Sequence, residues 1–412
     1  MVVNVNYTFY LNKINFNFQL FLIRNISFLL SIEKEYSIIL FLFQTGYKMR
    51  ELSCGIVGLP NVGKSTLWNA LTKKAAAAAN FPFCTIDPNV GIVEVYDPRL
   101  QELSKISKSE KLVYPAVTYV DIAGLVKGAS QGEGLGNQFL ANIRESDIII
   151  HVVRCFENDD VIHVAGKIDP INDIEVIHLE LILSDLQMIE NILAKVEKQV
   201  KGKKEFQNTV VCLRKARDHL NQNHPLRTLA LTQEECVLLK NYPFLTNKKV
   251  VYVTNVSESD LPDMNNQYVE KVRAYAEKEG NIVVPICAKI EEEIAQLSDK
   301  DALDFLEDLG IKKTGLNRLI KASFDSLGLI TYLTTGKIET RAWPIKKGTK
   351  APEAAGEIHN DLQKGFIRAE VVSFEDMVKY QGRMGAKEAG RVRSEGKDYI
   401  VQDGDVMIFF HN

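Results

Sequence analysis

The segment Gly58-Leu59-Pro60-Asn61-Val62-Gly63-Lys64-Ser65-Thr66 decides the fold of this chain. A short apolar run at 52–57 precedes it, and apolar residues at helical spacing follow it at 67–71. This is the GxxxxGK[ST] phosphate-binding loop in its required strand–loop–helix context. The pattern therefore predicts an α/β fold with a P-loop domain that binds a nucleoside triphosphate.

Each residue type in this loop has a chemical reason. Gly58 and Gly63 let the backbone turn its N–H groups toward the phosphates, where a Cβ atom would obstruct them. Lys64 reaches the β- and γ-phosphates and is the predicted catalytic cation, while the Ser65 hydroxyl ligates Mg²⁺. The start of the predicted helix adds its positive dipole end. The predicted nucleotide contacts of the loop are Asn61, Val62, Gly63, Lys64, Ser65 and Thr66.

A second motif is expected to hold the metal from the other side. The strand-like run 116–120 ends in a DxxG motif, in which Asp121 would hold Mg²⁺ through water and the Gly124 N–H would meet the γ-phosphate. Thr85 stands where a switch threonine would complete the Mg²⁺ shell, although an ordinary loop threonine is the alternative. The glycine-rich segment 127–136 is predicted to be a switch loop that the γ-phosphate orders, with a passive loop as the alternative.

The composition limits the class of protein. A length of 412 residues suggests two or three domains. Hydrophobic residues at 46% and charged residues at 25% are typical of a soluble globular protein. The net charge of −3 gives no overall attraction to nucleic acid. Six scattered cysteines without a CxxC pair argue against a zinc site or a disulfide framework, and for a reducing compartment.

Residues 1–48 differ from the rest of the chain. They are rich in Asn, Phe, Ile, Leu and Tyr and contain no alanine. Their apolar runs, 16–22 and 38–43, are shorter than the ~20 residues that span a bilayer, and neither a basic start nor a small-residue cleavage site indicates a signal peptide. We therefore expect no membrane segment, and we interpret Met49 as the start of the native chain.

Taken together, these motifs resemble the YchF (Ola-type) ATPases of the Obg group of translation-factor P-loop proteins. The resemblance covers residues 49–412. It rests on GLPNVGKSTLWNALT at 58–72, NFPFCTIDPN at 80–89, VDIAGLVKGASQGEGLGNQFLANIRE at 120–145, NVSE at 255–258 and KGFIRAEVVSFED at 364–376. It implies a cytoplasmic protein that favours ATP and associates with the large ribosomal subunit and the whole ribosome.

The base-reading motif departs from that of an ordinary GTPase. A GTPase ends a strand with NKxD, whose carboxylate accepts hydrogen bonds from guanine N1–H and N2–H₂. Here the plausible strand 249–254 is followed by Asn255, Val256, Ser257 and Glu258, so the lysine is missing and the acid is longer. Because adenine lacks those donors, loss of the reader removes most of the guanine preference. Asn255, Val256 and Glu258 are the predicted base contacts, and a surface turn is the alternative.

The position after DxxG holds Leu125, where Ras-like enzymes place a glutamine that orients the attacking water. Slow intrinsic hydrolysis is therefore predicted, or help from another group or a partner. His151, in the strand-like run 148–153, is a candidate for positioning that water, although a histidine among isoleucines and valines is more often a core residue. Asn61 resembles the asparagine with which some related proteins coordinate K⁺.

A helical insertion is predicted at 171–245. Apolar residues form a sustained 4-3-3-4-3-4 seam of Leu179, Leu183, Leu186, Ile189, Leu193, Val196 and Val200. A second run of Val210, Leu213, Ala216 and Leu220 follows a break at Gly202, which predicts an antiparallel hairpin. The resemblance implies a coiled-coil arm here. Residues 195–217 hold eight Lys or Arg against two Glu, so they either contact RNA phosphates or form a solvated face.

The nucleotide-binding domain is predicted to comprise 49–170 and 246–327, because the segment 285–289 stands where a base-contacting backbone loop would come. From 328 to 412 the pattern changes to short strands. The predicted strands are 340–344, 365–372, 399–401 and 406–410. This region resembles a TGS domain, a small β-grasp binding module, and its basic stretch 379–397 favours RNA, a protein partner or solvation equally.

The leading hypothesis is a ribosome-associated regulatory ATPase whose nucleotide state reshapes its switch segments. One alternative is a GTPase of the Obg group. Another is a nucleotide-dependent binding adaptor with little turnover, which Leu125 keeps open.

Overall fold

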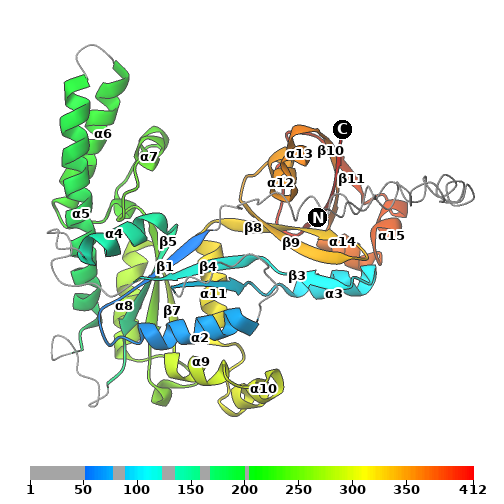
Figure 1. Ribbon diagram of the computed structural model, residues 1–412, viewed down its shortest axis with the longest axis horizontal. Helices are drawn as coiled ribbons and strands as arrows, with labels where there is room; N and C mark the ends of the chain where they lie inside the picture. The colour runs from blue at the N-terminus through cyan, green and yellow to red at the C-terminus, as the bar shows by residue number, and fades with distance from the viewer. Residues whose placement is uncertain (1–51, 78–88, 123–134, 158–167, 200–203) are drawn as a thin grey trace, which may run out of the picture. The chain divides into compact units, whose positions relative to one another are not determined.

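The computed structural model describes residues 52–77, 89–122, 135–157, 168–199 and 204–412 (Figure 1). The predicted extension 1–48 lies outside the described residues. So does most of the predicted switch loop.

A six-stranded sheet with the order β2-β4-β1-β5-β6-β7 forms the first domain. All its pairs are parallel except that β2 is antiparallel to β4 at the edge. The strands are β1 (Ser53–Val57), β2 (Val90–Glu94), β4 (Ala116–Asp121), β5 (Ile148–Arg154), β6 (Lys249–Asn255) and β7 (Ile282–Ile286). The predicted strands at 52–57, 116–120, 148–153, 249–254 and 282–284 are thus confirmed.

Helices cover both faces of this sheet (Figure 1). They are α2 (Lys64–Ala77), α4 (Leu135–Glu145), α5 (Pro170–Gln199), α8 (Gln267–Glu279), α9 (Ala288–Ile294), α10 (Asp299–Asp308) and α11 (Gly315–Ser326). Successive strand residues face opposite sides. In β1, for example, Ile56 packs in the cluster of α2 and α11, whereas Val57 packs in the cluster of α4, α5 and α8. Parallel strands buried on both faces explain why these segments read as continuous apolar runs.

The predicted helical hairpin is confirmed as α5 and α6 (Lys204–Leu220), followed by η2 (Leu226–Thr228) and α7 (Gln233–Lys240). The single seam predicted along α5 is wrong, because Leu179 and Leu183 are 45% and 41% exposed. One half of α5 packs on the first sheet and the other half packs on α6 and α7, so two different faces are buried. The residues that face the sheet are Ile174, Ile177 and Leu181, and those that face the hairpin include Ile182, Ile189 and Leu193.

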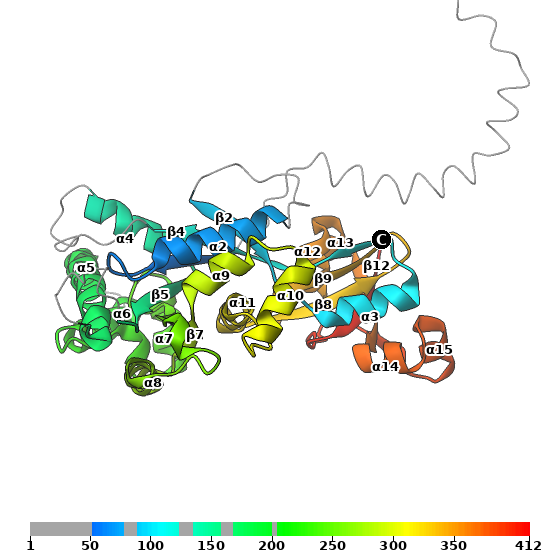
Figure 2. The ribbon, with the colours of Figure 1, turned by 90° about the horizontal axis from the view of Figure 1, so that it is seen from below.

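A second six-stranded sheet, with the order β11-β10-β12-β8-β9-β3, forms the C-terminal domain. Its strands are β3 (Lys111–Val113), β8 (Leu329–Thr335), β9 (Glu339–Lys346), β10 (Phe366–Ser373), β11 (Arg393–Glu395) and β12 (Asp405–His411). Its helices are α3 (Pro98–Ser107), α12 (Ala351–Ile358), α13 (Asn360–Lys364), α14 (Phe374–Lys379) and α15 (Arg383–Glu388). Figure 2 shows α12 and α13 on one side of β8 and β9, and α3 and α14 on the other. The strand predicted at 399–401 is wrong, since this segment makes only an isolated bridge between Ile400 and Lys350.

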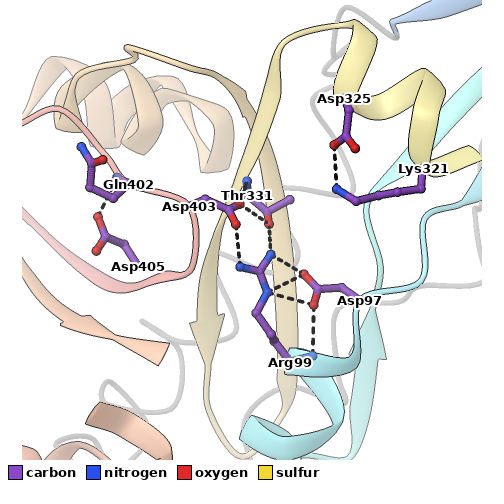
Figure 3. Close-up of polar contacts among 8 residues, drawn as sticks. All are labelled: Asp97, Arg99, Lys321, Asp325, Thr331, Gln402, Asp403 and Asp405. Carbon is purple, nitrogen blue, oxygen red and sulfur yellow. Dashed lines mark hydrogen bonds and ion pairs between the residues drawn. The ribbon is translucent and has the colours of Figure 1, made fainter. Parts of the chain in front are cut away.

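The segment 97–113 lies within the range 49–170 that the sequence assigned to the nucleotide-binding domain, yet it packs in the C-terminal domain. Strand β3 pairs parallel with β9, and α3 packs on the same sheet. Arg99 fastens it there, because its guanidinium donates to Asp97 at 2.7 Å, to Thr331 Oγ1 at 2.7 Å and to Asp403 at 2.8 Å (Figure 3). The chain therefore leaves the first sheet after β2, enters the second sheet, and returns through β4.

None of the helices in the described part of the chain has the length and apolar character needed to cross a membrane.

Candidate functional site

The phosphate-binding loop joins the end of β1, at the centre of the first sheet, to the start of α2 (Figure 1). Open parallel sheets place ligand sites beyond the carboxyl ends of their strands, where the connecting loops meet. The first turn of α2 presents backbone N–H groups and the positive end of the helix dipole, which together favour an anion. The loop thus has the position and the backbone polarity of a phosphate site.

Two positions of this loop admit only glycine. Gly63 has a φ of +96°, and a Cβ atom on it would lie 2.2 Å from Asn255 Nδ2. A Cβ atom on Gly58 would lie 2.6 Å from the carbonyl oxygen of Val152 in β5. The sequence analysis explained these glycines by the access that the phosphates need. The structure adds a second reason, because Asn255 in β6 and Val152 in β5 approach too closely for a side chain.

Lys64 and Asp121 bring opposite charges to the phosphate end. Lys64 Nζ donates to the carbonyl oxygen of Leu59 at 3.2 Å, which folds the side chain back over the loop. Burial lowers the pKa of Lys64, and the charge of Asp121 raises it. Burial likewise raises the pKa of Asp121, and Lys64 opposes this shift. Each group therefore lies within electrostatic range of the other, at the ends of β4 and of the loop.

Asn255 ties the loop to the other end of the site. Its Nδ2 donates to the Val62 carbonyl oxygen at 3.0 Å, and its Oδ1 accepts from the backbone N–H of Ala288 at 3.0 Å. The side chain is buried. Asn255 thus holds the phosphate loop against the loop that follows β7.

The two residues predicted to read the base beside Asn255 have different environments. Val256 is 3% exposed, packs in the core cluster of α4, α5 and α8, and donates its backbone N–H to the Ile286 carbonyl oxygen. Glu258 begins the short helix η3 (Glu258–Asp260), and its Oε1 lies 2.5 Å from Lys289 Nζ. Of these two side chains, only that of Glu258 reaches solvent.

A cleft of about 720 Å³ connects the two ends. Its walls include Asn61 and 63–66 on one side and 255–259 on the other. Among the described residues, the predicted nucleotide contacts converge on this cleft, except for Val62. Val62 is buried, and its carbonyl oxygen accepts from Asn255. Asp121, a predicted metal ligand, does not line the cleft.

The cleft also contains Lys289, which ends the segment 285–289 that was expected to contact the base through its backbone. Phe156 and Glu157, shortly after β5, and Glu292 in α9 line the cleft as well and were not predicted. Their position after the carboxyl ends of β5 and β7 is a signal that the sequence carried, because parallel strands next to a P-loop strand end at the same edge.

His151 lies away from this cleft. Its ring is 2% exposed, 5.6 Å from the ring of Tyr252 and 6.2 Å from that of His178. Burial lowers the pKa of His151 to about 3, and the positive charges of Arg227 and Lys64 add to the shift. The imidazole is thus neutral at neutral pH and packed among side chains of α5 and β6, as expected of a core residue.

Of the predicted metal ligands, Ser65 and Asp121 lie among the described residues. Thr85 and Gly124 lie outside the described residues, as does Leu125. Ser65 is exposed in the first turn of α2, and Asp121 is half-buried near Lys64. A hydroxyl and a carboxylate are the hard oxygen donors that Mg²⁺ prefers, so these two residues fit the ion. No cluster of three or more His, Cys, Asp or Glu side chains suited to a metal occurs among the described residues.

Comparison with known proteins extends over both domains. Residues 53–200 match a family model described as "50S ribosome-binding GTPase". Residues 329–412 match the model YchF-GTPase_C, described as "Protein of unknown function (DUF933)".

Full-length relatives are also similar. The ribosome-binding ATPase YchF of Haemophilus influenzae is 54% identical over 360 residues, which cover 87% of this chain and 99% of the relative. The ribosome-binding ATPase YchF of Bacillus subtilis is 53% identical over 363 residues, 88% of this chain and 99% of the relative. The solved structure of the Schizosaccharomyces pombe YchF GTPase matches with a TM-score of 0.81 at 35% identity, covering 89% of this chain and 100% of that chain.

Proposed function

This chain belongs to the YchF family, and from this premise we propose that it is a ribosome-associated regulatory ATPase that binds ATP with Mg²⁺ and hydrolyses it slowly. The observation that carries the proposal is the cleft that runs from Lys64 at the phosphate end to Glu258 at the base end. A nucleoside triphosphate has a phosphate chain for the first end and a base for the second.

ATP is favoured over GTP because the guanine reader is altered at two points. The position that a GTPase fills with lysine is Val256, which is buried in the core and offers no stem over the base. The acid is Glu258, which Lys289 already holds. The bacterial relatives carry the name ATPase, whereas the fission yeast structure carries the name GTPase. A GTPase is therefore the second candidate.

The residues proposed to bind the nucleotide divide between the two ends of the cleft. Those at the phosphate end are Asn61, Val62, Gly63, Lys64, Ser65, Thr66 and Gly124, and those at the base end are Asn255, Val256 and Glu258. Ser65, Thr85 and, through water, Asp121 would hold Mg²⁺. When bound, the ion supplies positive charge to the β- and γ-phosphates. Asn61 is the proposed oxygen ligand for K⁺.

Lys64 is the proposed catalytic cation, since its charge faces the transferred phosphoryl group, where negative charge develops in the transition state. Slow turnover follows from Leu125, whose hydrocarbon side chain cannot orient an attacking water. A role for His151 in positioning that water has little support from its buried place between Tyr252 and His178. If turnover is negligible even with a partner, the adaptor alternative applies.

The proposed partner is the ribosome, specifically its large subunit and the assembled particle, and the proposed location is the cytoplasm. The basic stretch 195–217 and the basic residues of 379–397 are the proposed RNA contacts, because Lys and Arg bind phosphates. The nucleotide state would alter these contacts through the segments that flank β2 and β4.

The decisive experiment measures the affinities for ATP and GTP and the rates of hydrolysis, with and without ribosomes. We expect ATP to bind at least as tightly as GTP, slow turnover alone, and faster turnover with ribosomes. A GTP preference of roughly 10⁴-fold, as expected of a site built for guanine donors, would replace the ATPase with a GTPase. Nucleotide binding without turnover under either condition would favour the adaptor.

A further inference from the structure

The base end of the cleft contains three carboxylates, and each already has a partner. Glu157 Oε1 accepts from the Tyr268 hydroxyl at 2.6 Å, and Glu292 Oε1 accepts from Asn69 Nδ2 at 2.8 Å. The third, Glu258, stands at the position of the guanine-reading acid and lies 2.5 Å from Lys289 Nζ. A base that enters this end of the cleft meets carboxylates that are already engaged.

The pair of Glu258 and Lys289 spans the cleft from one loop to the other. Glu258 follows β6 and Lys289 follows β7, and Asn255 fixes the two loops to each other through the Ala288 N–H. Both side chains reach solvent, with 47% of Glu258 and 68% of Lys289 exposed, and both line the cleft. The fixed spacing of the two loops brings the Lys289 ammonium group to the Glu258 carboxylate.

We propose that Lys289 is a specificity-determining residue, which holds Glu258 and so withholds from guanine the carboxylate that its N1–H and N2–H₂ groups require. This inference rests on the proposed function, since it explains why the site does not prefer GTP. Adenine has no N1–H or N2–H₂, so ATP does not lose these two hydrogen bonds when Lys289 occupies the acid. Guanine must displace the lysine before it gains its hydrogen bonds.

The backbone of the same loop supports this assignment. The Ala288 N–H, a donor that could otherwise serve a carbonyl oxygen of a base, is already taken by Asn255 Oδ1 at 3.0 Å. Both the acceptor and this donor at the base end are therefore engaged within the protein. The sequence of 255–258 already shows that the lysine stem is missing. Only the fold reveals that the remaining acid, Glu258, is occupied by Lys289.

The size of the effect follows from the exposure of the pair. Ion pairs between solvent-exposed groups contribute little, and displacing one changes an affinity by about two- to fivefold at most. Salt screens such pairs. Lys289 should therefore give a modest preference for ATP, measured as the ratio of the ATP and GTP affinities, and this ratio should fall as the salt concentration rises.

The test compares the ATP:GTP affinity ratio, measured by calorimetric titration at low and high salt, in wild-type protein, Lys289→Ala and Lys289→Arg. We expect Lys289→Ala to lower the ratio by about two- to fivefold, mainly through tighter GTP binding, and to remove the salt dependence of the ratio. Lys289→Arg, which keeps the pair, should retain both. In a Glu258→Gln background, Lys289→Ala should change the ratio no further.

Lys321→Ala is the matched control, because it removes another exposed pair, with Asp325 at 2.6 Å, within α11 (Figure 3). A general loss of positive charge would weaken the binding of ATP and of GTP equally, and would leave the ratio of their affinities unchanged. An unchanged ratio in Lys289→Ala, or a wild-type ratio that does not respond to salt, overturns the inference and leaves the ATPase proposal intact. Failure of the wild-type protein to bind ATP overturns the ATPase proposal instead.

Discussion

The side-chain amide of Asn255 donates a hydrogen bond to the carbonyl oxygen of Val62 at 3.0 Å, although 193 positions separate them in the chain. The same amide accepts from Ala288. One buried side chain thus sets the distance between the phosphate loop and the base loop. A rigid spacing of these two loops is a requirement for a site that holds both ends of one nucleotide.

Asn255→Ala is expected to disrupt both stability and binding. It leaves a buried carbonyl oxygen and a buried N–H without partners, at a cost of about 1–3 kcal/mol for each group. Chemical denaturation should show the lower free energy of unfolding, and titration should show at least tenfold weaker ATP binding. The exposed Asn241→Ala is the control, and wild-type values in both measurements would contradict the role of Asn255.

Lys64→Ala is expected to abolish phosphate-dependent nucleotide binding while leaving the fold intact. Lys64 brings its charge to the start of α2, beside the exposed Ser65. The exposed Lys73→Ala, in the same helix, is the matched control for charge and helix propensity. Titration with ATP, together with circular dichroism, distinguishes lost binding from lost structure. Wild-type ATP affinity in Lys64→Ala would remove the loop from the proposed site.

Restoring the guanine reader is expected to shift the base preference. Val256→Lys with Glu258→Asp rebuilds the sequence N-K-S-D, and the shorter acid also withdraws its carboxylate from Lys289. Because Val256 is buried, the lysine should lower stability, so Val256→Met with Glu258→Asp controls for the core change. Competition titration should give a lower ATP:GTP ratio for the rebuilt motif than for the control. Equal ratios would mean that the base is read elsewhere.

The buried His151 makes stability depend on pH. Its pKa in the folded protein is about 3, well below its ordinary value near 6.5, because burial disfavours the charged form. Between these two values the unfolded chain binds a proton that the folded chain does not, so stability falls as the pH falls from about 6.5 to about 3. The limit is about 1.4 kcal/mol for each pH unit and each such histidine.

His151→Gln should therefore flatten this slope, measured as the free energy of unfolding at pH 7.5 and pH 5. The neighbouring groups that share the site are His178 from α5, Tyr252 from β6, Glu279 from α8 and Arg227 from η2. The pKa of His178 is also lowered, so part of the slope should remain. The exposed His411→Gln should leave the slope unchanged. If His151→Gln has the wild-type slope, the imidazole is not buried as described.

The contact of Arg99 with Asp403 is expected to hold α3 and β3 on the C-terminal sheet. Arg99→Ala removes charge-assisted hydrogen bonds to Asp97, Thr331 and Asp403, which should cost about 1–3 kcal/mol. The exposed Lys105→Ala in the same helix is the control. Arg99→Ala and Asp403→Asn should be less than additive when combined, because they remove the same contact.

The two tryptophans allow each domain to be followed separately. Trp68 packs in the hydrophobic core of the first domain, and Trp343 packs in the hydrophobic core of the C-terminal domain. In Arg99→Ala, Trp343 fluorescence, recorded in a Trp68→Phe background, should report unfolding at a lower denaturant concentration than in the same background without Arg99→Ala. Equal midpoints would show that the contact does not stabilise the C-terminal domain.

Much of the fold follows from local pattern. The glycines and the lysine of 58–66 can be recognised without neighbours, because a phosphate loop needs particular backbone angles and one charge within nine residues. Strands β1, β4, β5, β6 and β7 read as apolar runs because both faces of each are buried. The hairpin of α5 and α6 follows from its 3.6-residue period.

The errors and omissions have a common physical reason. Leu179 and Leu183 fit the period of α5, but which face is buried depends on whether the sheet or α6 is the neighbour. The three residues of β3 are too few to carry a period, and their partner β9 lies more than 200 positions later. Pairing between segments so distant leaves no trace in either segment alone.

By itself, the sequence determined the P-loop, the class of ligand and the loss of the guanine-reading lysine, since each depends on residue type at fixed local spacing. Only the tertiary structure decided that Asn255 ties Val62 to Ala288, that Lys289 holds Glu258, and that His151 is enclosed by α5 and β6. These relationships join residues of different strands, helices and loops. They exist only where the fold brings those distant segments together.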